Sequence, residues 1–209
     1  MKSVLMTFMV IVAGLAMTAP DASAQSGNRN GRADKQQERM DAWKKDMEEF
    51  KARSEQNRQL RELTDSIAFI QALAAVRNQD FVLEANTVSF RNGSMVFVNS
   101  TTNFISVKGK RATVQISPSD FVSGPNGVGG VTVDGMISGP EYRVDKHGNI
   151  TYSFGVMGIG INAQVEIYMS PGSNNASATI YPNFNSNTVW LQGNIVPYEN
   201  SGVIEGSSL

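Results

Sequence analysis

The feature that most constrains the fold is a strict alternation of residue types near the C-terminal end of the chain. Between Ile159 and Met169 every second residue is apolar, and the intervening residues are Gly, Asn, Gln, Glu and Tyr. Shorter runs of the same period occur at residues 112–117, 150–156 and 176–181. A period of two gives a strand with one buried side and one solvent-facing side. These segments therefore predict an antiparallel β-sheet.

Turn signals between these runs indicate how the strands connect. Residues 91–93, 108–110, 146–149 and 171–173 each combine Gly with residues that tolerate positive φ or fix a turn. No run of helical period separates the strands, so a parallel sheet with crossover helices is not expected. About eight strands in roughly 125 residues fit a lipocalin-like barrel, although a two-sheet sandwich gives the same alternation.

The inward positions leave the content of such a barrel open. A small barrel is either filled by its own side chains or able to hold one ligand. Bulky inward residues favour a filled core, and they are Ile159, Ile161, Val165, Ile167 and Ile180. Small inward residues leave room for a small apolar ligand, and they are Ala163, Ala176 and Ala178.

The N-terminal residues predict export. Lys2 precedes an apolar run at residues 4–19, and the small residues at 22–24 follow it. This is the anatomy of a secretory signal peptide covering residues 1–24, with cleavage between Ala24 and Gln25. The apolar run is shorter than the roughly 20 residues that a membrane span needs. We therefore expect a periplasmic or extracellular protein with no transmembrane anchor after cleavage.

The amino-acid composition limits the kinds of site and partner that this chain can have. The chain has no cysteine, one histidine and a formal net charge of -1. The absence of cysteine excludes disulfides, thiolate metal sites and a lipid anchor on an N-terminal cysteine. The balanced charge argues against a nucleic-acid partner, which usually leaves a basic footprint.

Charge also divides the chain near Asp80. Residues 25–80 hold 11 of the 18 Lys and Arg residues. We expect a disordered linker at 25–31, a charged helical segment at 32–63 and a β-barrel domain at 64–209. The domain begins with a leading helix at 64–78, for which Thr64 to Ser66 supply N-cap chemistry. The residues expected to pack this helix on the barrel are Ile67, Phe69, Ile70, Leu73 and Ala74.

The charged segment at residues 32–63 has two possible interpretations. Met40, Trp43, Met47 and Phe50 form a short coiled-coil-like apolar stripe, but the next positions are polar. A sustained coiled coil needs three or four heptads. The segment is thus either a solvated spacer or a helix that contacts a partner groove through Trp43, Met47 and Phe50.

Few residues suggest catalysis. His147 lies within a turn signal, whereas a Ser-His-Asp triad needs a buried, oriented histidine. The Gly-rich loop with Pro125, Asn126, Gly127 and Gly129 lacks the Gly-Lys-Ser/Thr ending of a phosphate loop. It reads as a structural turn or as a loop at the barrel mouth, where ligand contacts tend to lie. No cofactor, metal site or catalytic residue is predicted.

Strand parity points to an aromatic surface. Tyr168, Tyr181 and Trp190 occupy positions that alternate with the apolar residues of three successive strands. If these strands are neighbours, three aromatic side chains share the polar face of one sheet. Such a face suits a glycan, a partner protein or the N-terminal helix, or it reflects cross-strand packing alone.

Four segments resemble a known family. They read DFVLEA at 80–85, VNSTTNFISV at 98–107, GPNGVGGVTVDG at 124–135 and PNFNSN at 182–187. They are similar to the exported family called domain of unknown function 4251, found mainly in Bacteroidetes, and the resemblance covers residues 75–209. It implies a lipocalin-like antiparallel barrel and no assigned activity. The charged segment at 32–63 is unlike the shorter linker expected of relatives.

The sequence therefore indicates an all-β barrel domain preceded by an α-helical segment. The favoured function is non-catalytic binding of a small apolar ligand or an envelope protein. The alternative is a structural or assembly factor of the cell envelope that acts through its charged helix.

The leader gives a direct prediction. Protein recovered from the exporting cell should begin at Gln25, because signal peptidase cuts after the small residue Ala24. Intact mass and N-terminal sequencing measure this start. A chain that retains Met1 to Ala24 would contradict the predicted leader.

Overall fold

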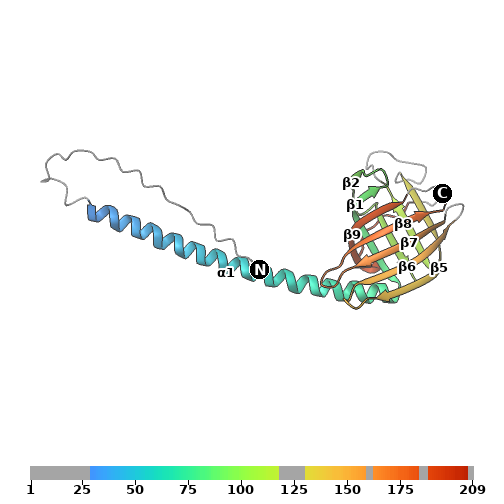
Figure 1. The fold of residues 1–209 in the computed structure, drawn as a ribbon, viewed down its shortest axis with the longest axis horizontal. Helices are drawn as coiled ribbons and strands as arrows, with labels where there is room; N and C mark the ends of the chain where they lie inside the picture. The colour runs from blue at the N-terminus through green and yellow to red at the C-terminus, as the bar shows by residue number, and fades with distance from the viewer. Residues whose placement is uncertain (1–28, 118–129, 159–161, 184–187, 207–209) are drawn as a thin grey trace. The chain divides into compact units, whose positions relative to one another are not determined.

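The computed structural model describes residues 29–117, 130–158, 162–183 and 188–206. The chain divides into two compact units, residues 1–54 and 55–209. The first unit contains the N-terminal part of helix α1 (Arg29–Asn78), and the second contains the rest of α1 and the strands (Figure 1). The predicted cleavage residues Ala24 and Gln25 lie outside the described residues.

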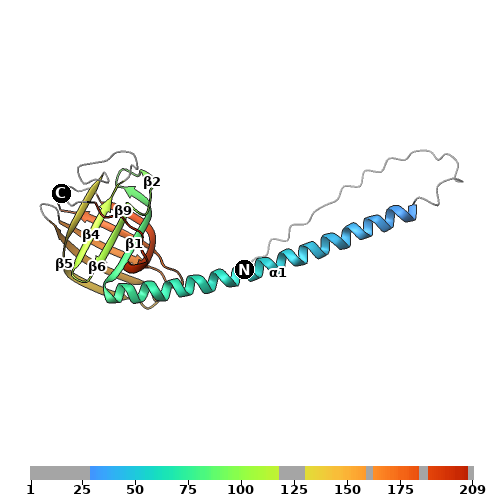
Figure 2. The same ribbon diagram turned by 180° about the vertical axis from the view of Figure 1, so that it is seen from behind.

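The described strands form one antiparallel sheet that closes on itself (Figures 1 and 2). Their bounds are β1 (Asp80–Phe90), β2 (Met95–Phe97), β3 (Phe104–Lys108), β4 (Arg111–Ile116), β5 (Val131–Val144), β6 (Ile150–Gly158), β7 (Asn162–Met169), β8 (Asn175–Pro182) and β9 (Val189–Pro197). The order is β2-β1-β3-β4-β5-β6-β7-β8-β9, and β1 also pairs with β9. This last pairing makes an eight-stranded barrel, with β2 as an additional strand on β1. The predicted barrel is confirmed, and the sandwich is excluded.

The apolar residues that alternate with polar ones along the strands face the inside of the barrel and form its core. Along β7, exposed and buried residues alternate without exception. The inward residues Val165, Ile167 and Ile180 are buried as predicted, whereas Ile159 and Ile161 lie outside the described residues. Several inward side chains have no accessible surface at all, namely Phe81, Leu83, Phe154, Val165 and Leu191. Because no water molecule can touch these side chains, no water-sized space adjoins them, and the interior around them is filled.

A group of aromatic rings occupies this interior. The ring of Tyr152 lies 5.8 Å from that of Phe81 and 5.3 Å from that of Phe154, measured between centroids. The Tyr152 hydroxyl is buried and has no hydrogen-bond partner among the described residues. Burial raises the pKa of this hydroxyl above its ordinary value. The tyrosine thus contributes ring packing while its hydroxyl carries a desolvation cost.

Helix α1 is continuous through the residues predicted to cap a second helix. Thr64 donates from Oγ1 to the Leu60 carbonyl at 2.8 Å, and Ser66 donates from Oγ to the Glu62 carbonyl at 2.7 Å. Both hydroxyls therefore bond backwards within the helix, so the predicted N-cap is wrong. Because Ser and Thr can satisfy their hydroxyls in either way, the local sequence did not distinguish a cap from a helix interior. No described helix combines the length and apolar character of a membrane span.

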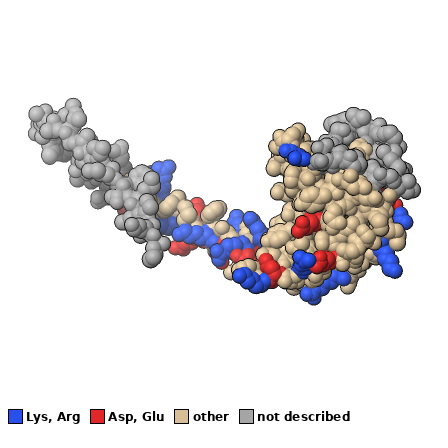
Figure 3. Space-filling model, turned by 45° about the vertical axis from the view of Figure 1, so that its right-hand side comes forward, with Lys and Arg blue, Asp and Glu red and all other residues tan. Residues whose placement is uncertain are grey.

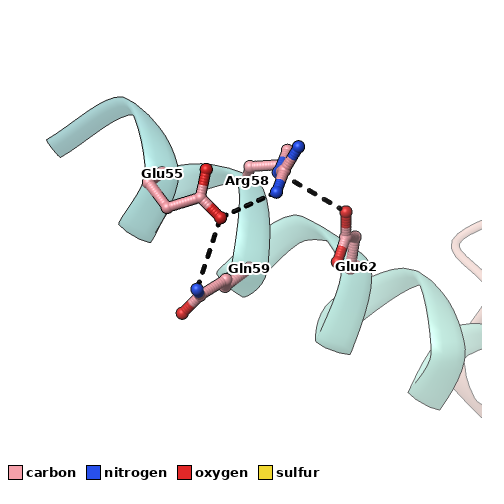
Figure 4. Close-up of polar contacts among 4 residues, drawn as sticks. All are labelled: Glu55, Arg58, Gln59 and Glu62. Carbon is pink, nitrogen blue, oxygen red and sulfur yellow. Dashed lines mark hydrogen bonds and ion pairs between the residues drawn. The ribbon is translucent and has the colours of Figure 1, made fainter. Parts of the chain in front are cut away.

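Ion pairs support the exposed part of this helix in the second unit (Figure 4). Arg58 contacts Glu55 at 2.7 Å and Glu62 at 3.8 Å, and Gln59 donates to the same Glu55 oxygen at 3.4 Å. Spacings of three and four residues bring these side chains together on one helix face. Each exposed pair stabilises the helix by about 0.3–0.5 kcal/mol.

The last turns of α1 pack against the barrel core, but not with all of the predicted residues. Ala72, Ala75 and Val76 are buried in the core, and Phe69 and Leu73 pack against it. Ile67 and Ile70 are instead 58% and 63% exposed, and Ala74 is also exposed. The prediction for these three was wrong because the helix has apolar residues on both faces, and only packing decides which face is buried.

The C-terminal segment is fastened to the barrel by a buried glutamine. Gln115 has no accessible surface, and its Nε2 donates to the carbonyls of Thr102 and Ile204, both at 3.0 Å. Its Oε1 accepts from the Gly206 amide at 2.8 Å and from the Thr132 hydroxyl at 3.2 Å. Ser106 on β3 also donates from Oγ to Glu205 Oε1 at 3.3 Å, so the residues after β9 lie along the outside of β3 and β4.

Replacing this glutamine should loosen the C-terminal segment. Gln115→Ala leaves buried carbonyl and amide groups unpaired, and it should lower the free energy of unfolding by about 1–3 kcal/mol. Urea denaturation measures the loss, and hydrogen exchange at Ile204 and Gly206 reports the freed segment. The matched control, Gln164→Ala, changes an exposed glutamine on β7. Equal stability of the two variants would contradict this role for Gln115.

Removing the unpaired interior hydroxyl should not weaken the fold. Tyr152→Phe keeps the ring contacts, so the free energy of unfolding should be unchanged or higher. The raised pKa means that above pH 10.0 the unfolded tyrosine ionises while the folded one stays neutral, which lowers wild-type stability as the pH rises. The variant should lose less stability than the wild type between pH 9 and pH 11, as measured by urea denaturation. A destabilised Tyr152→Phe protein would show that the hydroxyl has a partner inside the barrel.

Candidate functional site

The outer face of β7, β8 and β9 presents three aromatic side chains to solvent. Tyr168, Tyr181 and Trp190 are 42%, 46% and 39% exposed. Their strands are consecutive neighbours in the sheet, as expected. Exposed aromatic rings on three adjacent strands make an outer surface on which a ligand or partner can pack.

The strand register fixes how these rings lie. Tyr168 on β7 is opposite Ser177 on β8, and Trp190 on β9 is opposite Thr179 on β8. Tyr181 and Trp190 are therefore diagonal neighbours on adjacent strands, at a spacing that large aromatic side chains can bridge. Tyr168 lies farther along the barrel, between Thr151 on β6 and Ser177 on β8.

A surface groove begins beside Tyr168. It has a volume of about 380 Å³ and crosses β7, β8, β9 and β1. Its lining residues are Asn86, Tyr168, Ser170, Asn175, Ala176, Ser177, Gln192 and Gly193. The side chains of Tyr168, Asn175 and Gln192 are exposed, so the groove lies on the outside of the barrel. We call these eight residues the polar groove.

A bulge in β1 places Asn86 at this groove. β1 pairs with β9 in regular register up to Ala85, and the register shifts between Ala85 and Thr87. The extra residue, Asn86, is exposed, and the inward positions change from odd numbers before it to Val88 after it. Bulges of this kind re-aim a side chain at functional positions.

Gly193 allows the strands to approach at this point. A Cβ atom on Gly193 would collide with the carbonyl oxygen of Glu84 on β1. Only glycine fits there without moving the backbone. Gly193 is also one of the residues that line the polar groove.

The polar groove is rich in hydrogen-bonding groups and has no charged side chain in its lining. Among the described residues, the side chains of Asn175, Ser177 and Gln192 make no hydrogen bond within the protein. Asn86 accepts from the Thr87 hydroxyl at 3.1 Å and keeps its amide hydrogens unused. The face of the barrel drawn in Figure 3 is mostly uncharged, with Lys, Arg, Asp and Glu in small scattered groups. The groove therefore offers neutral donors and acceptors.

The histidine predicted in a turn is found there. His147 is exposed between β5 and β6, and its amide donates to Asp145 Oδ1 at 2.8 Å. Asn149 donates its side-chain amide to Asp145 Oδ2 at 2.7 Å, which with the turn amides lowers the pKa of Asp145. These contacts form a structural Asx turn.

The carboxylates of the described strands lie apart from one another, and two of them pair with arginines. Glu141 pairs with Arg143 at 2.6 Å, and Asp134 pairs with Arg111. The residues that the structure describes include no group of three His, Cys, Asp or Glu side chains able to hold a metal ion. The loop with Pro125, Asn126, Gly127 and Gly129 lies outside them.

The helix residues predicted to contact a partner lie in the first unit. Trp43 and Phe50 are 56% and 68% exposed, and Met47 is half-buried. Their side chains project from a helix that carries charges of both signs. In the second unit, Leu60, Leu63, Ile67 and Ile70 are also more than half exposed.

Sequence reasoning found the aromatic residues but missed the polar groove. Strand parity places Ser177 and Gln192 on the same outer face as Tyr168. Asn86 could not be placed in this way, because the bulge changes the parity of β1 after Ala85. Pairing of the first and last strands, which brings Asn86 next to Gln192, leaves no signal in either strand alone.

Comparison with known proteins identifies the family. No curated protein matches the chain. A crystal structure of a DUF4251 family protein from Bacteroides eggerthii is 49% identical and matches 67% of this chain and 94% of that chain, with a TM-score of 0.59. The model of the family described as domain of unknown function (DUF4251) matches residues 64–195. The resemblance drawn from the sequence is confirmed, and the chain belongs to the DUF4251 family.

Proposed function

We propose that this protein is an exported, non-catalytic binding protein that meets its ligand or partner on the outside of its barrel. The observation that carries this proposal is the contrast between the two sides of β7, β8 and β9. Inward residues such as Val165 and Leu191 have no accessible surface, while Tyr168, Tyr181 and Trp190 on the outer side are about 40% exposed. Large aromatic side chains left in water are typical of recognition surfaces.

The packing of the barrel interior also supports binding on the outer face. A lipocalin-like carrier needs a cavity inside the barrel, and the rings of Phe81, Tyr152 and Phe154 occupy that space here. The predicted leader at residues 1–24 supports export, which would expose the outer surface to envelope proteins or extracellular molecules. The single histidine in a turn and the dispersed carboxylates give no support to an enzyme.

A second candidate function is that of an envelope assembly factor acting through α1. Leu60, Leu63, Ile67 and Ile70 favour it, since four large aliphatic side chains at spacings of three and four residues are exposed. The neighbouring Gln59, Thr64, Ser66 and Gln71 are uncharged, so an amphipathic helix of a partner protein could pack there without opposing charge.

One experiment distinguishes the two functions. The protein is recovered from the exported fraction of its own cells, and its native mass is measured in three forms of the full chain. The first is the wild type, the second has Tyr168, Tyr181 and Trp190 changed to Ser, and the third has Leu60, Leu63, Ile67 and Ile70 changed to Gln. We expect bound mass on the wild type and on the helix variant, and its loss from the aromatic variant.

A matched control is Met157→Ser on β6, which removes a side chain that is 55% exposed. This control should keep the bound mass. Loss from the helix variant alone would favour the assembly function. A bare monomer mass for the wild type would contradict binding through the barrel.

A further inference from the structure

We propose that the polar groove binds an uncharged saccharide, with Tyr168 as the platform for one sugar ring. This inference rests on the proposed function, because it names the class of ligand for the same outer face. It starts from the eight lining residues, which supply carboxamides, hydroxyls and one aromatic ring and no ionisable acid or base other than the tyrosine itself.

The hydrogen-bonding groups match sugar hydroxyls. A carboxamide offers two donors and an acceptor within a few ångströms, and a serine hydroxyl offers both roles. Asn86, Asn175 and Gln192 surround the groove with three carboxamides, and Ser170 and Ser177 add two hydroxyls. Since each sugar hydroxyl both donates and accepts, this mixture pairs with it in either direction.

The strand register brings these groups onto one short stretch of surface. Ser177 is opposite both Tyr168 on β7 and Gln192 on β9, and Gln192 is in turn opposite Thr87 on β1. Asn86 precedes Thr87 at the bulge, and Asn175 lies on the same side of β8 as Ser177. The groups therefore project from adjacent rigid strands, which hold them in place before a ligand arrives.

Tyr168 supplies the apolar part of the site. Its ring is 42% exposed at one side of the groove. One face of a sugar ring consists mainly of C–H groups, and such a face packs on an aromatic ring while the hydroxyls at its rim reach polar neighbours. A tyrosine beside three carboxamides therefore accommodates both parts of a saccharide.

Other ligand classes fit the groove less well. A phosphate or carboxylate would find no Lys or Arg in the lining. An apolar molecule would cover carboxamides and leave them unpaired. An extended peptide could not add as a strand, because β7, β8, β9 and β1 each have neighbours on both sides. The volume of about 380 Å³ lies in the lower part of the range for ligand sites and suits one or two sugar rings.

The test is an NMR titration of the full, ¹⁵N-labelled protein. The side-chain amides of Asn86, Asn175 and Gln192 give their own signals, so they report contact in the groove directly. The uncharged probes are maltotriose and triacetylchitotriose, the charged probe is trigalacturonic acid, and the apolar probe is lauric acid. Soluble starch and glycol chitin form a second arm that separates free saccharides from polymer-bound ones.

We expect an uncharged trisaccharide to shift these three signals. Tyr168→Ala should weaken its binding about tenfold, whereas Tyr168→Phe should retain it because the ring remains. Gln192→Ala should weaken it about threefold to tenfold, and the matched control Gln164→Ala, outside the groove on β7, should not. A wild-type pattern of backbone signals shows that each variant is folded. Shifts with the polymers alone would indicate that the sugar is recognised within a longer glycan.

Two results would show that the groove does not bind an uncharged saccharide. They differ in what they imply for binding on the outer face. Shifts caused only by trigalacturonic acid or lauric acid would replace the ligand class and keep the outer-face site. Absence of shifts with every probe would reject the saccharide, and the native mass of the aromatic variant would then decide whether the outer face binds anything.

Discussion

Pairing of β1 with β9 is the interaction on which the rest of the structure depends. It joins the first long strand to the last, from Phe81 opposite Pro197 to Phe90 opposite Val189, and turns an open sheet into a barrel. Closure removes exposed strand edges and gives every barrel strand an inner and an outer side. A disulfide-free chain obtains its core in this way, since the inward side chains of all eight strands meet in one interior.

The same pairing creates the most unusual part of the surface. The two strands pair along their length with a register shift at Asn86, and they approach closely where Gly193 has no side chain to strike the Glu84 carbonyl. These accommodations of closure turn Asn86 outward beside Gln192 and open the polar groove next to Tyr168. The described inward side chains are aromatic and aliphatic and pack together, which supports the proposal that ligands bind on the outer face. This arrangement differs from that of a carrier barrel, in which the ligand replaces part of the core.

Short sequence patterns predicted those features that depend on residues close together in the chain. Alternation identified the buried and exposed sides of β7, β8 and β9, and the turn residues located His147 correctly. Closure, the bulge at Asn86 and the hydrogen bonds of Gln115 join residues far apart in the chain, so no local pattern contains them. Helix α1 illustrates a different limit, because Ile67 and Ala72 are both apolar and only tertiary packing decides that Ala72 is buried. The aromatic residues of the site were predictable from parity, whereas the groove required the register of the closed sheet.

Binding on the outer face, as proposed above, goes together with a barrel whose interior is filled. Xenon enters empty apolar cavities in proteins, so methyl NMR under xenon pressure tests the interior directly. If the interior is filled, the methyl signals of Ile167, Leu191 and Ile195 should not move more than those of exposed residues. Large, saturable shifts of these inward methyl groups would instead reveal a cavity inside the barrel, and the barrel would then not be filled.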